Sequence, residues 1–74
     1  MKRYTNLSGN SGVFEYDIGP DFVRVKFLGS STYLYTYRSA GVENVEHMKR
    51  LAKDGRGLAT FITRRVRDAY EARE

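Results

Sequence analysis

With 74 residues, the chain is long enough for one small domain, and 41% hydrophobic residues is ordinary for a globular fold. The absence of cysteine excludes disulfides and thiol-based metal sites. A net charge of +4 is only mildly basic, and the sequence shows neither a signal peptide nor a long apolar segment, so we expect a soluble cytoplasmic protein without a membrane partner.

The beginning of the chain is polar and rich in turn-forming residues, and no hydrophobic period runs through it. We therefore expect residues 1–12 to form a flexible N-terminal arm. The remainder, residues 13–74, is expected to fold as a single domain.

Two alternating segments then predict two strands. Over residues 13–18 the large apolar side chains share one face: Phe14, Tyr16 and Ile18. Over residues 22–28 the same alternation places Val23, Val25 and Phe27 opposite Arg24 and Lys26. A turn at Gly19-Pro20-Asp21 separates the two strands.

The third strand carries tyrosine at every second position, so Tyr33, Tyr35 and Tyr37 are expected on one face. A three-residue loop, Gly29-Ser30-Ser31, would put these rings beside the apolar residues of the preceding strand. The pairs then expected are Phe27 with Tyr33, Val25 with Tyr35, and Val23 with Tyr37. In the first hairpin the same reasoning pairs Phe14 with Val25, Tyr16 with Val23, and Glu15 with Arg24.

After Arg38 the hydrophobic period becomes helical. A first stripe contains Val45, Met48, Leu51 and Ala52, with Ser39 or a nearby residue as the cap and Gly55 at the end. A second stripe runs through about four turns and contains Leu58, Phe61, Ile62, Val66, Ala69 and Tyr70. The predicted fold is α+β: a three-stranded antiparallel β-meander followed by two α-helices packed on its Val/Phe/Tyr face (β-β-β-α-α).

From about Ser8 to Tyr70 the chain resembles the KTSC domain, a small domain found at the C-terminus of some lysyl-tRNA synthetases and as stand-alone small proteins. The matching segments are Tyr16-Asp17, Val23-x-Val25-x-Phe27, Tyr33-x-Tyr35, Gly57-Leu58, Phe61-Ile62 and Val66-Arg67-x-x-Tyr70. Two positions depart from the pattern: Ala59 stands where relatives often carry asparagine, and no proline follows the tyrosine pair. The resemblance implies the fold and, through the synthetases, suggests RNA binding.

Basic residues are concentrated between Lys49 and Arg67, where seven of them stand against Asp54 alone. Six are candidates for phosphate contacts with RNA or another polyanion: Lys49, Arg50, Lys53, Arg56, Arg64 and Arg67. The alternative is a solvated helical surface in which Arg64 pairs with Asp68 and Arg67 with Glu71 at i,i+4 spacing.

Arg65 is unusual because a helical wheel places it within the apolar arc, between Phe61 and Ala69. Together with Tyr35 and Tyr70 it is a candidate site for an anion or a stacked base. Alternatively, the tyrosines form the core and the arginine side chain extends along it to the domain edge.

The sequence contains few residues that could support catalysis. His47 is the only histidine, and the sequence contains no recognisable nucleophile with its base, no metal-ligand cluster and no cofactor motif. We therefore expect a non-catalytic binding module for RNA or another polyanion. The alternative is a protein–protein interaction module, either a self-associating adaptor that forms a homodimer or a host- or phage-encoded modulator of a larger assembly.

Overall fold

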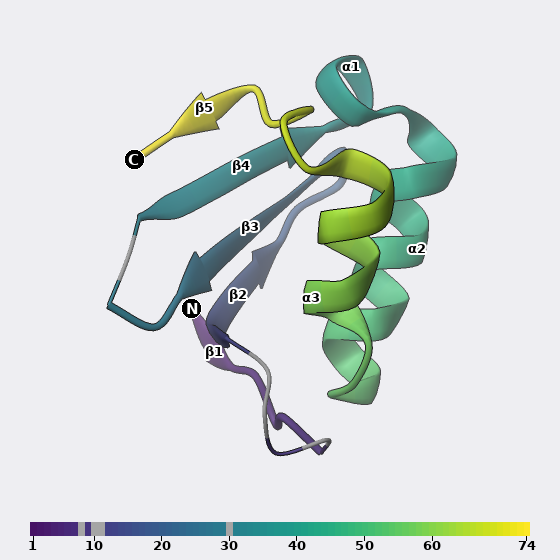
Figure 1. The fold of residues 1–74 in the computed structure, drawn as a ribbon. Helices are drawn as coiled ribbons and strands as arrows, with labels where there is room; N and C mark the ends of the chain where they lie inside the picture. The colour runs from purple at the N-terminus through teal and green to yellow at the C-terminus, as the bar shows by residue number, and fades with distance from the viewer. Residues whose placement is uncertain (8, 10–11, 30) are drawn as a thin grey trace.

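The computed structural model describes residues 1–7, 9, 12–29 and 31–74. Two helical segments lie on one face of an antiparallel sheet of five strands (Figure 1). The predicted α+β class is confirmed. The predicted count of three strands and the order β-β-β-α-α are wrong, because a short strand at each end of the chain joins the sheet.

The strands follow one another across the sheet in the order in which they occur in the chain. They are β1 (Lys2–Arg3), β2 (Val13–Ile18), β3 (Phe22–Phe27), β4 (Thr32–Thr36) and β5 (Ala72–Arg73). The helical elements are α1 (Tyr37–Ala40), α2 (Val42–Asp54), α3 (Leu58–Phe61) and the π-helical η1 (Ile62–Val66), which continues α3. The two helical segments on the sheet are α2 and the helix formed by α3 with η1. Among the described residues, no helix is long and apolar enough to cross a membrane.

The inward face of the sheet is the one expected from the alternating pattern. Tyr35 is 1% exposed, and Val23 and Val25 are completely buried. They share one core with buried residues of both helical segments, among them Met48 of α2 and Leu58 of α3. Val23 and Val25 of β3 and Tyr35 of β4 therefore form the inner layer, and Arg24 and Lys26 have the opposite parity on β3.

The predicted register of the β3–β4 hairpin is wrong by two residues. Tyr33 lies opposite Val25 and Tyr35 opposite Val23, where Phe27 and Val25 were expected. A shift of two residues keeps every side chain on its original face, so the hydrophobic pattern cannot distinguish the two registers. Ser30 of the predicted loop lies outside the described residues.

The β2–β3 hairpin is also shifted by two residues, with Tyr16 opposite Val25 and Ile18 opposite Val23. A bulge between Val13 and Glu15 adds an irregularity that alternation cannot predict. It brings Val13 into the core at 2% exposure. Phe14, expected inside, instead lies beside Arg3 and Lys26, whose charged groups are 4.8 and 5.9 Å from its ring centroid.

Tyr37 does not belong to the strand, so its predicted pairing with Val23 is wrong. Thr36 ends β4 and caps α1: its hydroxyl accepts a hydrogen bond from the Ser39 N–H at 3.0 Å. In return the Thr36 N–H donates to the Ser39 hydroxyl at 3.1 Å. This reciprocal capping box starts α1 at Tyr37. Ser39 therefore lies inside α1, whereas α2 begins after Gly41.

The last helix ends at Val66, about one turn earlier than predicted. Ala69 and Tyr70 still pack on the core, but from an extended segment that leads into β5. The Glu71 N–H donates to the Leu34 carbonyl at 2.6 Å, and the Glu74 N–H donates to the Thr32 carbonyl at 2.7 Å. Pairing with the free edge of β4 thus satisfies backbone groups that a longer helix would have satisfied internally.

The segment expected to be an N-terminal arm contributes β1, which pairs with β2, and the buried ring of Tyr4. The Tyr4 hydroxyl accepts a hydrogen bond from the Leu58 N–H at 3.4 Å. The Leu7 N–H donates to the Gly55 carbonyl at 2.7 Å. Part of the predicted arm, Ser8, Asn10 and Ser11, lies outside the described residues.

Candidate nucleic-acid interface

The helical layer carries most of the cations that the sequence identified. Six of these cations lie on α2, in the turn that follows it, and on or just after η1. We call them the helical cations: Arg50, Lys53, Arg56, Arg64, Arg65 and Arg67. Each is exposed, and none forms an ion pair with another described residue. These charges are therefore available to an external anion.

The helical cations form two groups. Arg50 and Lys53 lie in the last turns of α2, and Arg56 follows in the turn to α3. The other three lie at the end of η1 and just after it. Because α2 and α3 run in opposite directions, the two groups lie at opposite ends of the helical layer (Figure 1).

Lys49 was predicted to contact phosphate, but its ammonium group already has partners within the protein. It lies 2.8 Å from the Glu46 carboxylate and donates to the Pro20 carbonyl at 2.9 Å. The Tyr37 hydroxyl donates to the same carboxylate. The hydrogen bond to Glu46 raises the pKa of Lys49, and the bond from Lys49 lowers the pKa of Glu46. Lys49 therefore links α2 to the β2–β3 turn.

The alternative role for two of the arginines was an ion pair within the helix, Arg64 with Asp68 and Arg67 with Glu71. Neither ion pair forms among the described residues. Both pairs required the helix to continue past Arg67, but it ends at Val66. The Glu71 carboxylate instead accepts a hydrogen bond from the Thr36 hydroxyl at 2.8 Å. Arg64 and Arg67 thus remain without an acidic partner in the described part of the chain.

Arg65, which the helical wheel placed within the apolar arc, is exposed. The π-helical turn of η1 accounts for this exposure. Each turn of a π-helix takes up more residues than an α-helical turn, so each successive side chain rotates by a smaller angle. The rotation brings Val66 into the core at 2% exposure and leaves Arg65 outside.

Tyr35 and Tyr70, the other members of the predicted stacking site, do lie together. Their ring centroids are 6.3 Å apart in an edge-to-face arrangement, and Tyr70 also packs on Tyr33 at 4.9 Å. Burial raises the pKa of Tyr35 to about 12. Within the described residues Arg65 makes no cation–π contact with either ring. Tyr35 is a core residue and offers no free face for stacking.

The opposite face of the sheet holds aromatic residues that the sequence analysis did not identify as surface groups. Phe14 lies between Arg3 and Lys26, and the Arg24 guanidinium lies 5.5 Å from the Phe22 ring centroid. Phe22 could have been found, because it shares the parity of Arg24 and Lys26 in β3. The surface position of Phe14 could not have been found from the alternating pattern, because the bulge moves its side chain to the opposite face of the sheet.

The charges on this face are balanced, unlike those on the helical layer. Arg24 lies 3.8 Å from the Asp17 carboxylate and 3.4 Å from that of Glu74. The face therefore has cations with aromatic neighbours, but it lacks a surplus of positive charge.

His47, the only histidine, is exposed on α2, and its ring packs against Phe61 with centroids 4.5 Å apart. In the parts of the chain that the structure describes, no group of three or more His, Asp or Glu side chains is placed to hold a metal ion.

Comparison of the chain with protein-family models, with curated proteins and with solved structures finds no match.

Proposed function

We propose that the protein is a non-catalytic cytoplasmic binding module that holds RNA, or another polyanion, on its helical layer. The observation that supports this proposal is the set of six helical cations that are exposed and lack ion pairs within the described residues. Arginine and lysine at such positions contact phosphates and release counterions. Binding of this kind is weak, sensitive to salt and tolerant of sequence.

The dimensions of the helical layer agree with an extended ligand. A helix as long as α2, with its 13 residues, spans about 20 Å, and the helical cations are divided between the two ends of this layer. A nucleic-acid strand that followed the layer would meet Arg50, Lys53 and Arg56 at one end. It would meet Arg64, Arg65 and Arg67 at the other.

Membership of the KTSC family is part of the same proposal. Its support is the order of the motif residues and the central position of Tyr35 in the core, which suits a tyrosine that is central to the family pattern. Ala59, which replaces the frequent asparagine, is half-buried on α3 and packs against the core. The proposed phosphate contacts do not involve this position.

The test is a titration of labelled single-stranded RNA, followed by fluorescence anisotropy at several salt concentrations. Substituting Arg64→Glu together with Arg67→Glu removes two phosphate contacts. We expect affinity to fall by about tenfold or more, and the slope of log K against log salt to decrease by about 1.4.

The matched control is Arg3→Glu with Lys26→Glu, which changes the net charge by the same amount on the opposite face of the sheet. This variant should lose little affinity and keep the original salt slope. The proposal is wrong if the helical variant still binds like the unmodified protein, or if the control loses as much.

A second candidate function, protein–protein interaction, is favoured by the uncovered face of the sheet. Both long helical segments lie on the other side (Figure 1). On the uncovered face Phe14, Phe22 and Leu34 are only half-buried, and charges of both signs surround them. An apolar centre with balanced charge suits a protein partner or a second copy of the chain better than a polyanion.

Light scattering separates the two candidates. A homodimer or other assembly through this face should dissociate on Phe22→Glu substitution, and nuclease treatment should leave it intact. A monomer at all concentrations would contradict self-association.

A further inference from the structure

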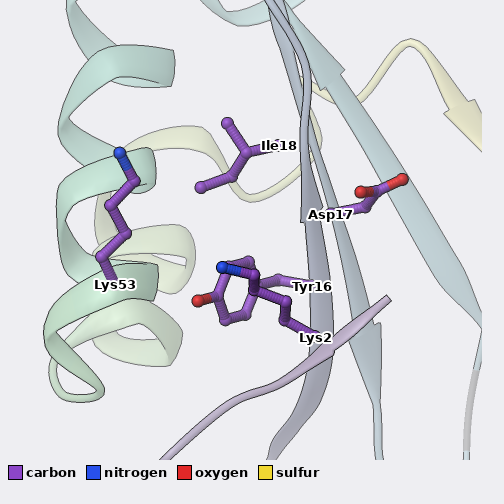
Figure 2. A pocket seen from close by; sticks show the side chains of 5 residues that line it. All are labelled: Lys2, Tyr16, Asp17, Ile18 and Lys53. Carbon is purple, nitrogen blue, oxygen red and sulfur yellow. The ribbon is translucent and has the colours of Figure 1, made fainter.

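A hollow of about 190 Å³ lies between the edge of the sheet at β1 and β2 and the C-terminal half of α2. Five residues line it: Lys2, Tyr16, Asp17, Ile18 and Lys53. Figure 2 shows Lys2 beside the phenol ring of Tyr16 on the sheet side of this space, and Lys53 on α2 across from them, with its ammonium group at the level of Ile18. Its volume is that of several water molecules, which is sufficient for a small polar ligand.

The groups around the hollow favour an anion. Lys2 and Lys53 are both exposed, and neither ammonium group forms an ion pair with a described residue. The Tyr16 ring is largely buried, but its hydroxyl points toward α2 and has no hydrogen-bond partner among the described residues (Figure 2). Residues with potential donors on β1, β2 and α2 thus line one hollow.

Asp17 is the only acid that lines the hollow, and its carboxylate is turned away. Figure 2 shows it on the opposite side of β2, and it lies 3.8 Å from the Arg24 guanidinium on the other face of the sheet. It therefore opposes an anion in the hollow only from a distance. Ile18 supplies an apolar wall.

We propose that this hollow is a binding site for a single phosphate group. Lys2 and Lys53 provide charge-assisted contacts from two sides, and the Tyr16 hydroxyl donates a third hydrogen bond. The phosphate belongs either to a small phosphorylated molecule or to the backbone of a nucleic acid. The site shares Lys53 with the helical cations, but it can be tested apart from the proposed function because Arg64, Arg65 and Arg67 lie at the other end of the helical layer.

Inorganic phosphate is the first probe, added at constant ionic strength while backbone amide signals are followed by NMR. We expect saturable shifts at Lys2, Tyr16, Ile18 and Lys53. Substituting Lys2→Gln or Lys53→Gln should each weaken binding about fivefold, the upper range for a solvent-exposed charged contact. Tyr16→Phe should weaken it without changing the fold, because only the hydroxyl is removed. Lys26→Gln, a lysine on the opposite face of the sheet, is the matched control and should bind unchanged.

A short single-stranded RNA is the second probe. Saturation by inorganic phosphate assigns the site to small phosphorylated molecules, and the same shifts produced by RNA alone assign it to backbone phosphate. The Arg64→Glu, Arg67→Glu variant should keep its phosphate shifts at the hollow even if it loses RNA. The inference is overturned if neither probe shifts these amides, or if the shifts persist in the Lys2→Gln, Lys53→Gln double variant.

Discussion

At the scale of single residues, burial in this small core changes the pKa of the Tyr35 hydroxyl. Its ring is 1% exposed between β3 and the segment that follows η1, and its hydroxyl lies 3.5 Å from the Arg67 carbonyl, a long hydrogen bond. Because the phenolate would lose most of its hydration there, burial raises the pKa of Tyr35 from 10.0 to about 12.

This shift predicts a loss of stability at high pH. The unfolded chain releases the Tyr35 proton near pH 10 and the folded chain near pH 12, so folding stability is full below pH 10 and falls as the pH rises toward 12. In Tyr35→Phe this part of the loss should be absent, while stability at neutral pH changes little because the lost hydrogen bond is long. Urea unfolding at a series of pH values measures both effects. An identical pH dependence in the two proteins would contradict the assignment.

At the scale of elements, the turn from α2 to α3 depends on Gly55. Its φ of +80° is left-handed, and its N–H donates to the Leu51 carbonyl at 3.0 Å to close α2. The N-terminal segment covers it closely: an added Cβ would lie 2.8 Å from the Cβ of Thr5. Gly29, in the β3–β4 hairpin, also has a positive φ of +63°, but it has open space around it.

These two glycines form a matched pair of substitutions. Gly29→Ala should cost about 1 kcal/mol, the usual penalty of a left-handed conformation for a residue with a side chain. Gly55→Ala should cost about 2 to 3 kcal/mol, because the new methyl group must also displace the N-terminal segment. Chemical denaturation gives both free energies of unfolding. Equal costs would show that the N-terminal segment does not pack on the turn.

The strands also show how far the sequence can predict this fold. The alternation of Val23, Val25 and Tyr35 is sufficient to choose the inner face of the sheet, because the wrong choice would bury Arg24 and Lys26. The register could not be predicted, because a shift of two residues conserves every face. The bulge between Val13 and Glu15 reverses the face of Phe14, and no glycine or proline lies within it to indicate its position.

The candidate site was predictable in composition but less so in detail. The concentration of cations from Lys49 to Arg67 is visible in the sequence, and six of the seven are free of ion pairs among the described residues. The exception, Lys49, finds its partners partly in the distant β2–β3 turn, which spacing along one helix cannot reveal. The strands β1 and β5 have two residues each, too few for a recognisable period.

At the scale of the whole molecule, Tyr4 connects the sheet to the helical layer. Its ring is 3% exposed, and its hydroxyl accepts a hydrogen bond from the Leu58 N–H at the start of α3. A chain of this size has few buried residues, so each large one supplies a substantial part of the total stability. The first residues thus contribute to the core shared by both layers.

We expect Tyr4→Ala to reduce the free energy of unfolding by about 3 to 4 kcal/mol, because it leaves a cavity the size of an aromatic ring. Tyr4→Phe keeps the ring and should cost only about 1 kcal/mol for the lost hydrogen bond. Thermal unfolding followed by circular dichroism ranks the variants. Leu7→Ala, at a side chain 55% exposed, serves as the control from the same segment. A cost for Tyr4→Ala no larger than that of the control would exclude this role.

The short outer strands also bear on aggregation. Open rows of N–H and C=O groups along the rim of a sheet are templates for amyloid-like stacking between chains. In the described part of the chain, the two-residue strand Lys2–Arg3 covers Glu15 and Tyr16 of β2 at one rim, and at the other rim Thr32 and Leu34 of β4 already bond to Glu74 and Glu71. A neighbouring chain would therefore find only short strands to extend at either rim, so we expect association between copies to rely mainly on side chains.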